Sequence, residues 1–249
     1  MDDHNREHFQ YADVPLTFSR ETRKPVLFGG QVDYEFTKWL ALRLRKEGMF
    51  IMTNSGPGVN LPRIAPWLDM VGAGETSADQ PDSYYAMVRS TIYRKPTSFG
   101  DSQIGRDSAE VVERKFRKCL LFAISPGAFG FQRNPGIRAV FKEFTPYVKL
   151  LGGAGWEPVT YAWSSDSRVY VERFGQLSKL YFSLYNTADA DADVELTVDA
   201  AALGRGEKVL EGLELLGKKE LDFRETSRAG LQVVAVHVPA RGNAIVLLR

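Results

Sequence analysis

Between residues 33 and 47, apolar side chains recur at the spacing of one helical face, and a short apolar run follows directly. The face is formed by Phe36, Trp39, Leu40 and Leu44. Asp33 can cap the start of this helix, and Gly48 can end it. The run from Met49 to Thr53 suits a strand that is covered on both faces, as in a parallel sheet. The segment therefore predicts a helix followed by a buried strand.

The alternation of helix and strand continues toward residue 153. It predicts strands at 67–73 and 95–99, a turn of helix at 62–66, helices at 82–92 and 108–124, and a last helix that follows Pro135 and ends at Gly152-Gly153. Alternating elements of this kind favour a parallel sheet with right-handed crossovers. Three strands are too few to close a barrel, so either further strands complete the sheet or it stays open.

Beyond Trp156 the helical spacing stops and short alternating runs begin. A hairpin is expected from 159–163 and 169–171, and further strands at 180–186, 194–199, 208–213, 231–238 and 244–249. Such spacing is typical of an antiparallel sandwich. We therefore expect two domains, at 1–157 and 158–249, with residues 1–30 forming a long loop.

Composition and charge narrow the classes of partner. Of the 249 residues, 44% are hydrophobic, and 32 Lys and Arg balance 31 Asp and Glu. No overall field favours nucleic acid or an anionic membrane. The chain as written shows no signal peptide and no apolar membrane span, which makes a cytoplasmic location the expectation.

Cofactor and metal motifs are absent from the sequence. There is no Walker loop, dinucleotide fingerprint or paired Cys-x-x-Cys, and the single cysteine, Cys119, lies among apolar neighbours as a small core residue. Asp2, Asp3, His4 and His8 lack a metal-ligand spacing and are expected to form a loose terminal segment. We expect neither a cofactor nor a metal.

Two stretches carry a resemblance to a known class of proteins. They are Thr145-Pro146-Tyr147-Val148-Lys149-Leu150-Leu151 and Gly155-Trp156-Glu157-Pro158-Val159-Thr160-Tyr161-Ala162, and together they resemble the junction between the last barrel helix and the C-terminal β domain of large TIM-barrel glycoside hydrolase-like proteins. Residues 6–13 and 52–54 are similar to loop and strand-end text in the same proteins.

The resemblance implies a fold in two parts. The fold would be α/β plus all-β: a partial (β/α)8 TIM barrel of about three closing β/α units, followed by an antiparallel β-sandwich. The three strands would be the sixth to eighth of the barrel, so this sequence departs from the family by beginning within it. A truncated gene, a split protein or a module completed by a partner would each explain that start.

In a TIM barrel the chemistry lies at the carboxyl ends of the strands, so residues directly after the apolar runs are candidates. Asn54 opens a glycine-rich turn and could bind a sugar hydroxyl, or serve only as a capping amide. Glu75 follows the small residues Gly72-Ala73-Gly74, and Asp101 follows the third strand. Glycoside hydrolysis needs two carboxyl groups, so Glu75 and Asp101 are the candidate catalytic pair. Capping or solvated roles are the alternatives for both.

Three further residues are candidates for substrate binding. Trp67 and Tyr84 could stack on the apolar face of a sugar, although core packing is the alternative for each. Asp69 could bind substrate or pair with a structural arginine such as Arg63.

The sequence thus predicts a carbohydrate-active protein that hydrolyses O-glycosidic bonds by carboxylate acid/base chemistry, as a fragment of a longer enzyme. The alternative is a non-catalytic carbohydrate-binding or interaction protein with a degenerate half-barrel. The expected partners are a carbohydrate substrate and either an upstream half-barrel chain or further copies of this chain.

Overall fold

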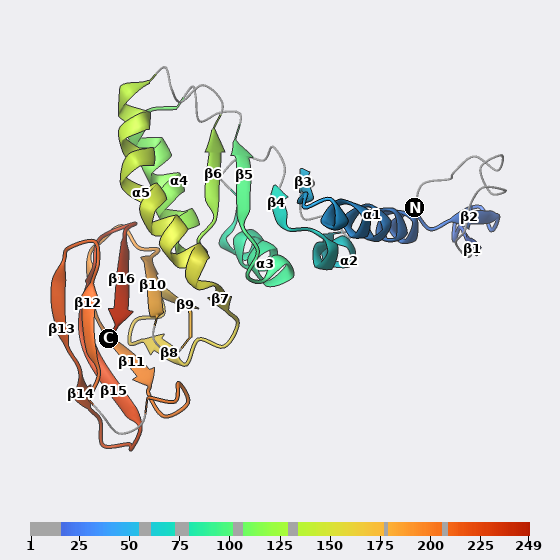
Figure 1. Ribbon diagram of the computed structural model, residues 1–249. Coiled ribbons are helices and arrows are strands. Elements are labelled where there is room, and N and C mark those ends of the chain that lie inside the picture. The colour runs from blue at the N-terminus through green and yellow to red at the C-terminus, as the bar shows by residue number, and fades with distance from the viewer. Residues whose placement is uncertain are drawn as a thin grey trace.

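The computed structural model describes residues 16–54, 61–72, 80–101, 107–128, 134–176, 179–205 and 209–249, with Gly100, Asp101 and Ala128 described by their backbone alone. The described part of the chain forms a parallel α/β unit followed by two antiparallel sheets (Figure 1).

The α/β unit is built on four parallel strands. They are β3 (Met52–Asn54), β4 (Met70–Gly72), β5 (Thr97–Asp101) and β6 (Ser125–Ala128), and they lie in the order β3-β4-β5-β6. The helices are α1 (Gly29–Lys46), α2 (Leu61–Ile64) with a 3-10 turn at Ala65–Trp67, α3 (Asp82–Ile92), α4 (Ala109–Leu121) and α5 (Pro135–Ala154). A small antiparallel pair, β1 (Leu16–Phe18) and β2 (Pro25–Leu27), precedes α1.

Local sequence signals explain where the two longest closing helices begin. The Ser108 hydroxyl accepts a hydrogen bond from the Val111 backbone N–H at the start of α4. The Asn134 side chain accepts bonds from the N–H groups of Gly136 and Ile137 at the start of α5, where Pro135 occupies the first helical position.

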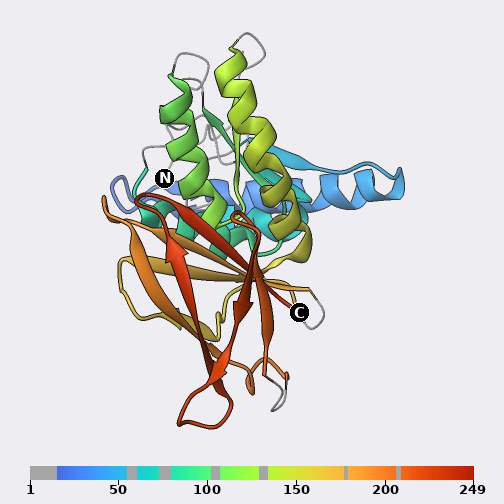
Figure 2. The ribbon, with the colours of Figure 1, turned by 90° about the vertical axis from the view of Figure 1, so that its left-hand side faces the viewer.

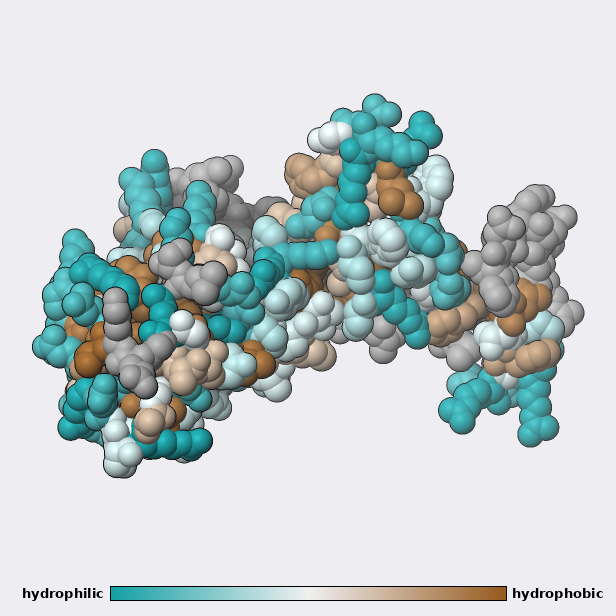
Figure 3. Space-filling view, turned by 60° about the horizontal axis from the view of Figure 1, so that its bottom comes forward, coloured by the Kyte–Doolittle hydropathy of each residue, from teal (hydrophilic) through white to brown (hydrophobic). Residues whose placement is uncertain are grey.

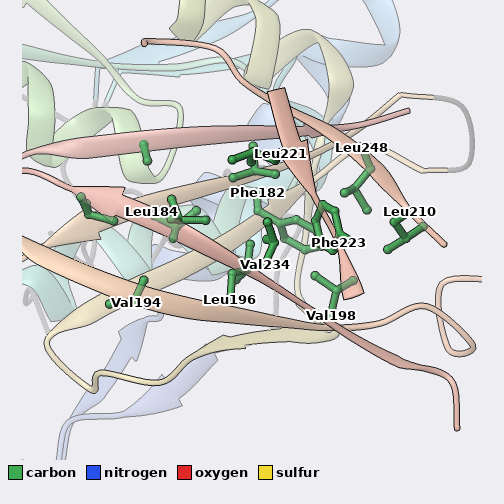
Figure 4. Packing of buried hydrophobic residues seen from close by; sticks show 14 of the residues in the cluster. Phe182, Leu184, Val194, Leu196, Val198, Leu210, Leu221, Phe223, Val234 and Leu248 are labelled. Carbon is green, nitrogen blue, oxygen red and sulfur yellow. The ribbon is translucent and has the colours of Figure 1, made fainter. Parts of the chain in front are cut away.

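The C-terminal part is a sandwich of two antiparallel sheets. One has the order β13-β12-β16-β10-β9-β7 and the other β14-β15-β11-β8. The strands are β7 (Trp156–Glu157), β8 (Ala162–Ser164), β9 (Val169–Phe174), β10 (Leu180–Asn186), β11 (Ala192–Asp199), β12 (Glu211–Glu214), β13 (Lys219–Asp222), β14 (Arg224–Glu225), β15 (Leu231–Val238) and β16 (Asn243–Leu248). Side chains from both sheets, including Phe182, Leu196 and Val234, meet in one apolar core (Figure 4).

The six-stranded sheet also packs against the helices, which explains why β10 is buried along its whole length. Alternate residues of β10 point into the sandwich, while Tyr181 joins the core that α4 and α5 form, as does Ile245 of β16. Figure 2 shows α4 and α5 side by side above the sheets. Asn243 strengthens this contact by donating its side-chain amide to the carbonyl of Arg117.

Buried charges lie along the same seam. The Arg89 guanidinium of α3 donates to the carbonyls of Tyr93, Lys95, Phe122 and Ala123. The carboxylate of Glu157, on β7, pairs with Arg94 and Arg173 and accepts a bond from the Gln176 side chain. Burial raises the pKa of Glu172, whose carboxylate accepts the indole N–H of Trp156.

The structure corrects several expectations. A fourth parallel strand, β6, stands where the sequence predicts only helix and loop, so the described residues contain one strand more than the expected three. The predicted hairpin is wrong, because β8 pairs with β11 in one sheet while β9 pairs with β10 in the other. The predicted strand at 67–73 is shorter, since residues 65–67 form a 3-10 turn. Residues 16–30, expected to be loop, hold β1, β2 and the first turn of α1.

The run 49–53 is also more exposed than a strand covered on both faces, because β3 forms one edge of its sheet. β7 is the first strand of the six-stranded sheet, and the division into two domains at residue 157 stays a prediction.

Candidate functional site

The carboxyl ends of β3 to β6 form one edge of the parallel sheet, on the side away from the sandwich (Figure 1). In the strand register Asn54 lies opposite Gly72, and Asp101 lies opposite Ala128. The edge therefore brings together the ends of segments that lie far apart in the sequence, as parallel sheets do at their ligand sites.

Asn54 and Gly72 fit closely at this edge. A Cβ atom on Gly72 would stand 3.0 Å from the Thr53 carbonyl oxygen and 3.4 Å from the Asn54 side-chain oxygen. Only glycine leaves room for both groups at that point. Asn54 is exposed, so its amide is available to a ligand at the edge.

The two predicted catalytic carboxylates are less fully defined. Glu75 lies outside the described residues, in the segment 73–79 that follows β4. Asp101 is the last residue of β5, and only its backbone is described. Their assignment stays a prediction.

Tyr84 lies in the first turn of α3 and is half-buried. Its ring lies 5.7 Å from that of Phe99 and 5.8 Å from that of Tyr85, measured between centroids. Phe99 is on β5, two residues before Asp101. Tyr84 thus belongs to an aromatic cluster directly behind the edge, where it packs against the core.

Asp69 lies at the opposite, amino end of β4. Its carboxylate accepts the Ile51 backbone N–H at 2.9 Å and pairs with Arg45 at 3.1 Å. The Ile51 hydrogen bond and the arginine lower the pKa of Asp69. The expected partner Arg63 instead lies over the ring of Phe28. These contacts favour a structural role.

Trp67 lies at the same amino end, in the 3-10 turn before β4. Its ring meets that of Tyr34 edge-on, with centroids 6.1 Å apart, and the Lys38 ammonium lies 5.9 Å from its centroid. Trp67 therefore packs against α1 and does not share the edge with Asn54 and Asp101.

The strongest computed charge perturbations lie away from this edge. Burial lowers the pKa of Arg89 to about 10 and raises that of Glu172, and both groups belong to the seam with the sandwich. Sequence reasoning gave no signal for either residue, because their burial depends on how α3 packs on β9. Among the described residues, no group of three or more His, Cys, Asp or Glu could hold a metal ion. None of the helices in the described ranges is long and apolar enough to cross a membrane.

Comparisons with known proteins give a likeness in structure alone. No protein-family model and no curated protein sequence matches the chain. Among solved structures, α-galactosidase I from Mortierella vinacea is similar with a TM-score of 0.54 and 13% identity, covering 88% of this chain and 63% of that one.

Two further structures show the same likeness. A GH27 β-L-arabinopyranosidase from Geobacillus stearothermophilus, in complex with arabinose, has a TM-score of 0.52 and 12% identity, covering 86% of this chain and 54% of that one. An α-amylase from Geobacillus thermoleovorans has a TM-score of 0.53 and 11% identity, covering 87% of this chain and 57% of that one. The chain thus spans between half and two thirds of the glycoside hydrolases it resembles, and it has the fold of their C-terminal barrel part and sheet domain.

Proposed function

We propose that this chain supplies the C-terminal half of a carbohydrate-active TIM barrel, in which Glu75 and Asp101 act as a carboxyl pair in glycoside hydrolysis. The observation that carries the proposal is the shared edge of β4 and β5, each followed or ended by an acidic residue. Three residues of chain join Gly72 to Glu75, which keeps their Cα atoms within about 11 Å.

Two carboxyl groups are what the reaction requires. One protonates the leaving oxygen, and the other acts as a base toward water or as the nucleophile. Neighbouring parallel strands deliver two such groups to one ligand, since strand ends lie about 5 Å apart. The small residues before Glu75 leave space for a sugar ring.

Asn54 fits the same proposal as a ligand for sugar hydroxyl groups. Its exposed amide can both donate and accept a hydrogen bond, which matches a hydroxyl group. Tyr84 supports the edge from behind through Phe99. Trp67 and Asp69 are left out of the proposed site, because they lie at the amino end of β4.

The remaining groups of the active site would come from further barrel strands. Four parallel strands cannot close a barrel, and the similar solved structures are longer than this chain. The proposed protein is therefore one part of a longer enzyme or of a two-chain enzyme.

A hydrolysis assay tests the proposal. A panel of p-nitrophenyl glycosides is offered to the chain alone and to its complex with the polypeptide encoded directly upstream. Glu75→Gln and Asp101→Asn are each expected to lower kcat by about 100-fold or more. Glu47→Gln, an exposed acid beyond α1, is the matched control and is expected to change nothing. Unchanged activity in Glu75→Gln, or no activity in either preparation, would reject the hydrolase.

A non-catalytic carbohydrate-binding role has one observation in its favour. The sandwich exposes three large aromatic side chains, namely Tyr161, Trp163 and Tyr170. Trp163 lies on β8, the edge strand of its sheet, and aromatic faces of this kind stack on sugars. Trp163→Ala would then weaken binding of soluble polysaccharides in a calorimetric titration, whereas Val209→Ala, an exposed apolar control, would not.

A further inference from the structure

α1 carries apolar side chains on two sides. One side faces the core, with Thr37 and Ala41 buried. The other side is an exposed stripe of large apolar residues at helical spacing, formed by Val32, Phe36, Trp39 and Leu42. Phe36 and Trp39 are 58% and 57% exposed, although surface helices usually place polar residues on their outer face.

The stripe continues into the segment after α1. Phe50 is 70% exposed, and Met49 and Met52 are about half exposed. β3 itself pairs with β4 on one side, and no strand lies on its other side in the part of the chain that the structure describes. In Figure 1, α1 extends away from the sheet, and Figure 3 shows apolar side chains, in brown, on this end of the molecule.

We infer that the stripe of α1 and the free edge of β3 together dock a further β/α unit, whose strand adds parallel to β3 and whose helix packs against Phe36 and Trp39. This inference rests on the proposed function and identifies the partner that completes the site.

The open surface has the form of one missing neighbour. Successive units of a parallel sheet place strand beside strand and helix beside helix. α1 and β3 are consecutive elements, and each lacks such a neighbour on its outer side within the described ranges. A partner that offered only a helix would leave the β3 edge uncovered.

The extent of the surface suits a stable interface. Seven large apolar side chains take part, and each is roughly half exposed: Val32, Phe36, Trp39, Leu42, Met49, Phe50 and Met52. At roughly 100 Å² for each side chain they offer about 700 Å², close to the roughly 800 Å² that one partner buries in a standard interface.

A second copy of the chain fits this surface poorly. Head-to-tail closure would bring β6 and α5 of one copy against β3 and α1 of the other. α5 exposes a single large apolar residue among those described, Leu150, at 38%. Pairing of two α1 stripes would give no parallel strand to β3.

Co-expression tests the inference. The full chain is produced with the polypeptide encoded directly upstream and examined by size exclusion with light scattering and by hydrogen exchange. We expect a 1:1 complex, slower exchange of the β3 amides and a blue shift of Trp39 emission. Phe36→Glu is expected to weaken the complex at least 100-fold, while Met87→Glu, an exposed apolar residue of α3, leaves it intact.

Three outcomes would overturn the inference: no complex with the upstream polypeptide, a complex insensitive to Phe36→Glu, or a homodimer that Phe36→Glu dissociates. Thermal unfolding of Phe36→Glu checks that the variant is folded. A complex that forms as expected but hydrolyses no glycoside would reject the proposed function and leave the docking surface in place.

Discussion

Replacement of Arg89 by methionine probes how the α/β unit is held together at the amino end of its strands. The guanidinium is 2% exposed and donates four hydrogen bonds, of 2.8–3.1 Å, to backbone carbonyls. Two of these carbonyls follow α4, at Phe122 and Ala123, and two follow α3, at Tyr93 and Lys95. Arg89 therefore ties the ends of both helices together.

The expected loss of stability follows from the carbonyls that the variant would leave without a donor. Those of Phe122 and Ala123 are buried with the guanidinium, and each stranded buried carbonyl costs about 1–3 kcal/mol. Desolvation works against this loss, since it lowers the pKa of Arg89 to about 10 and makes the charged group itself costly to bury. We expect a net loss of about 3 kcal/mol, a large share of the usual 5–15 kcal/mol of a domain.

Urea unfolding followed by circular dichroism measures the effect. Arg89→Lys keeps the charge and can retain only some of the four bonds, so its loss should be intermediate. Arg114→Met, an exposed arginine of α4, is the control and should stay within about 0.5 kcal/mol of the wild type. A variant Arg89→Met as stable as the wild type, or more stable, would show that desolvation outweighs the hydrogen bonds and would refute the role given to Arg89.

Three further substitutions test the packing and the charges. Phe182→Ala, in the fully buried centre of the sandwich, should cost about 3–5 kcal/mol in urea unfolding, and a loss below 1 kcal/mol would contradict the packing described. Gly72→Ala should cost about 1 kcal/mol, because the new Cβ would press on the Thr53 carbonyl oxygen at 3.0 Å; an unchanged midpoint would mean that the strand end can shift. The folded pKa of Asp69 is lowered, so its ionised form stabilises the fold above the unfolded pKa of about 4, and that contribution is lost as the pH falls through the folded value. Asp69→Asn should therefore be less stable than the wild type at pH 7, and a gap that does not narrow below about pH 4 would contradict this sign.

Periodicity predicts the elements that carry their own signal. The helix expected at 108–124 appears as Ala109–Leu121, and the strands expected at 180–186 and 231–238 appear with those bounds. β6 has no such signal, because Ser125-Pro126-Gly127-Ala128 combines two residues that are depleted in strands. Its pairing with β5 depends on the tertiary fold.

Contacts between distant segments explain the other differences. The stripe of Phe36 and Trp39 has the spacing of a buried face, yet Leu40 and Leu44 pack on the core while those two aromatic residues stay exposed. The sequence places an alternating run on either side of a turn at 164–168, but does not show that the chain changes sheets there.

The candidate site was predictable only where a residue follows a strand. Asn54 ends β3 and Asp101 ends β5, as the apolar runs indicate. Trp67 and Asp69 fall at the other end of β4, because the strand begins at Met70 and the apolar text before it forms the 3-10 turn. No periodicity distinguishes that turn from the first residues of a strand.

The central claim is that Glu75 and Asp101 act as one catalytic pair, and a double variant tests it most directly. Hydrolysis of a p-nitrophenyl glycoside is measured for the wild type, for each single variant and for Glu75→Gln combined with Asp101→Asn. Residues that act as a unit are strongly non-additive, so the double variant should lose no more of kcat/KM than the more damaged single variant. Losses that multiply, or a single variant that retains full activity, would contradict the pair.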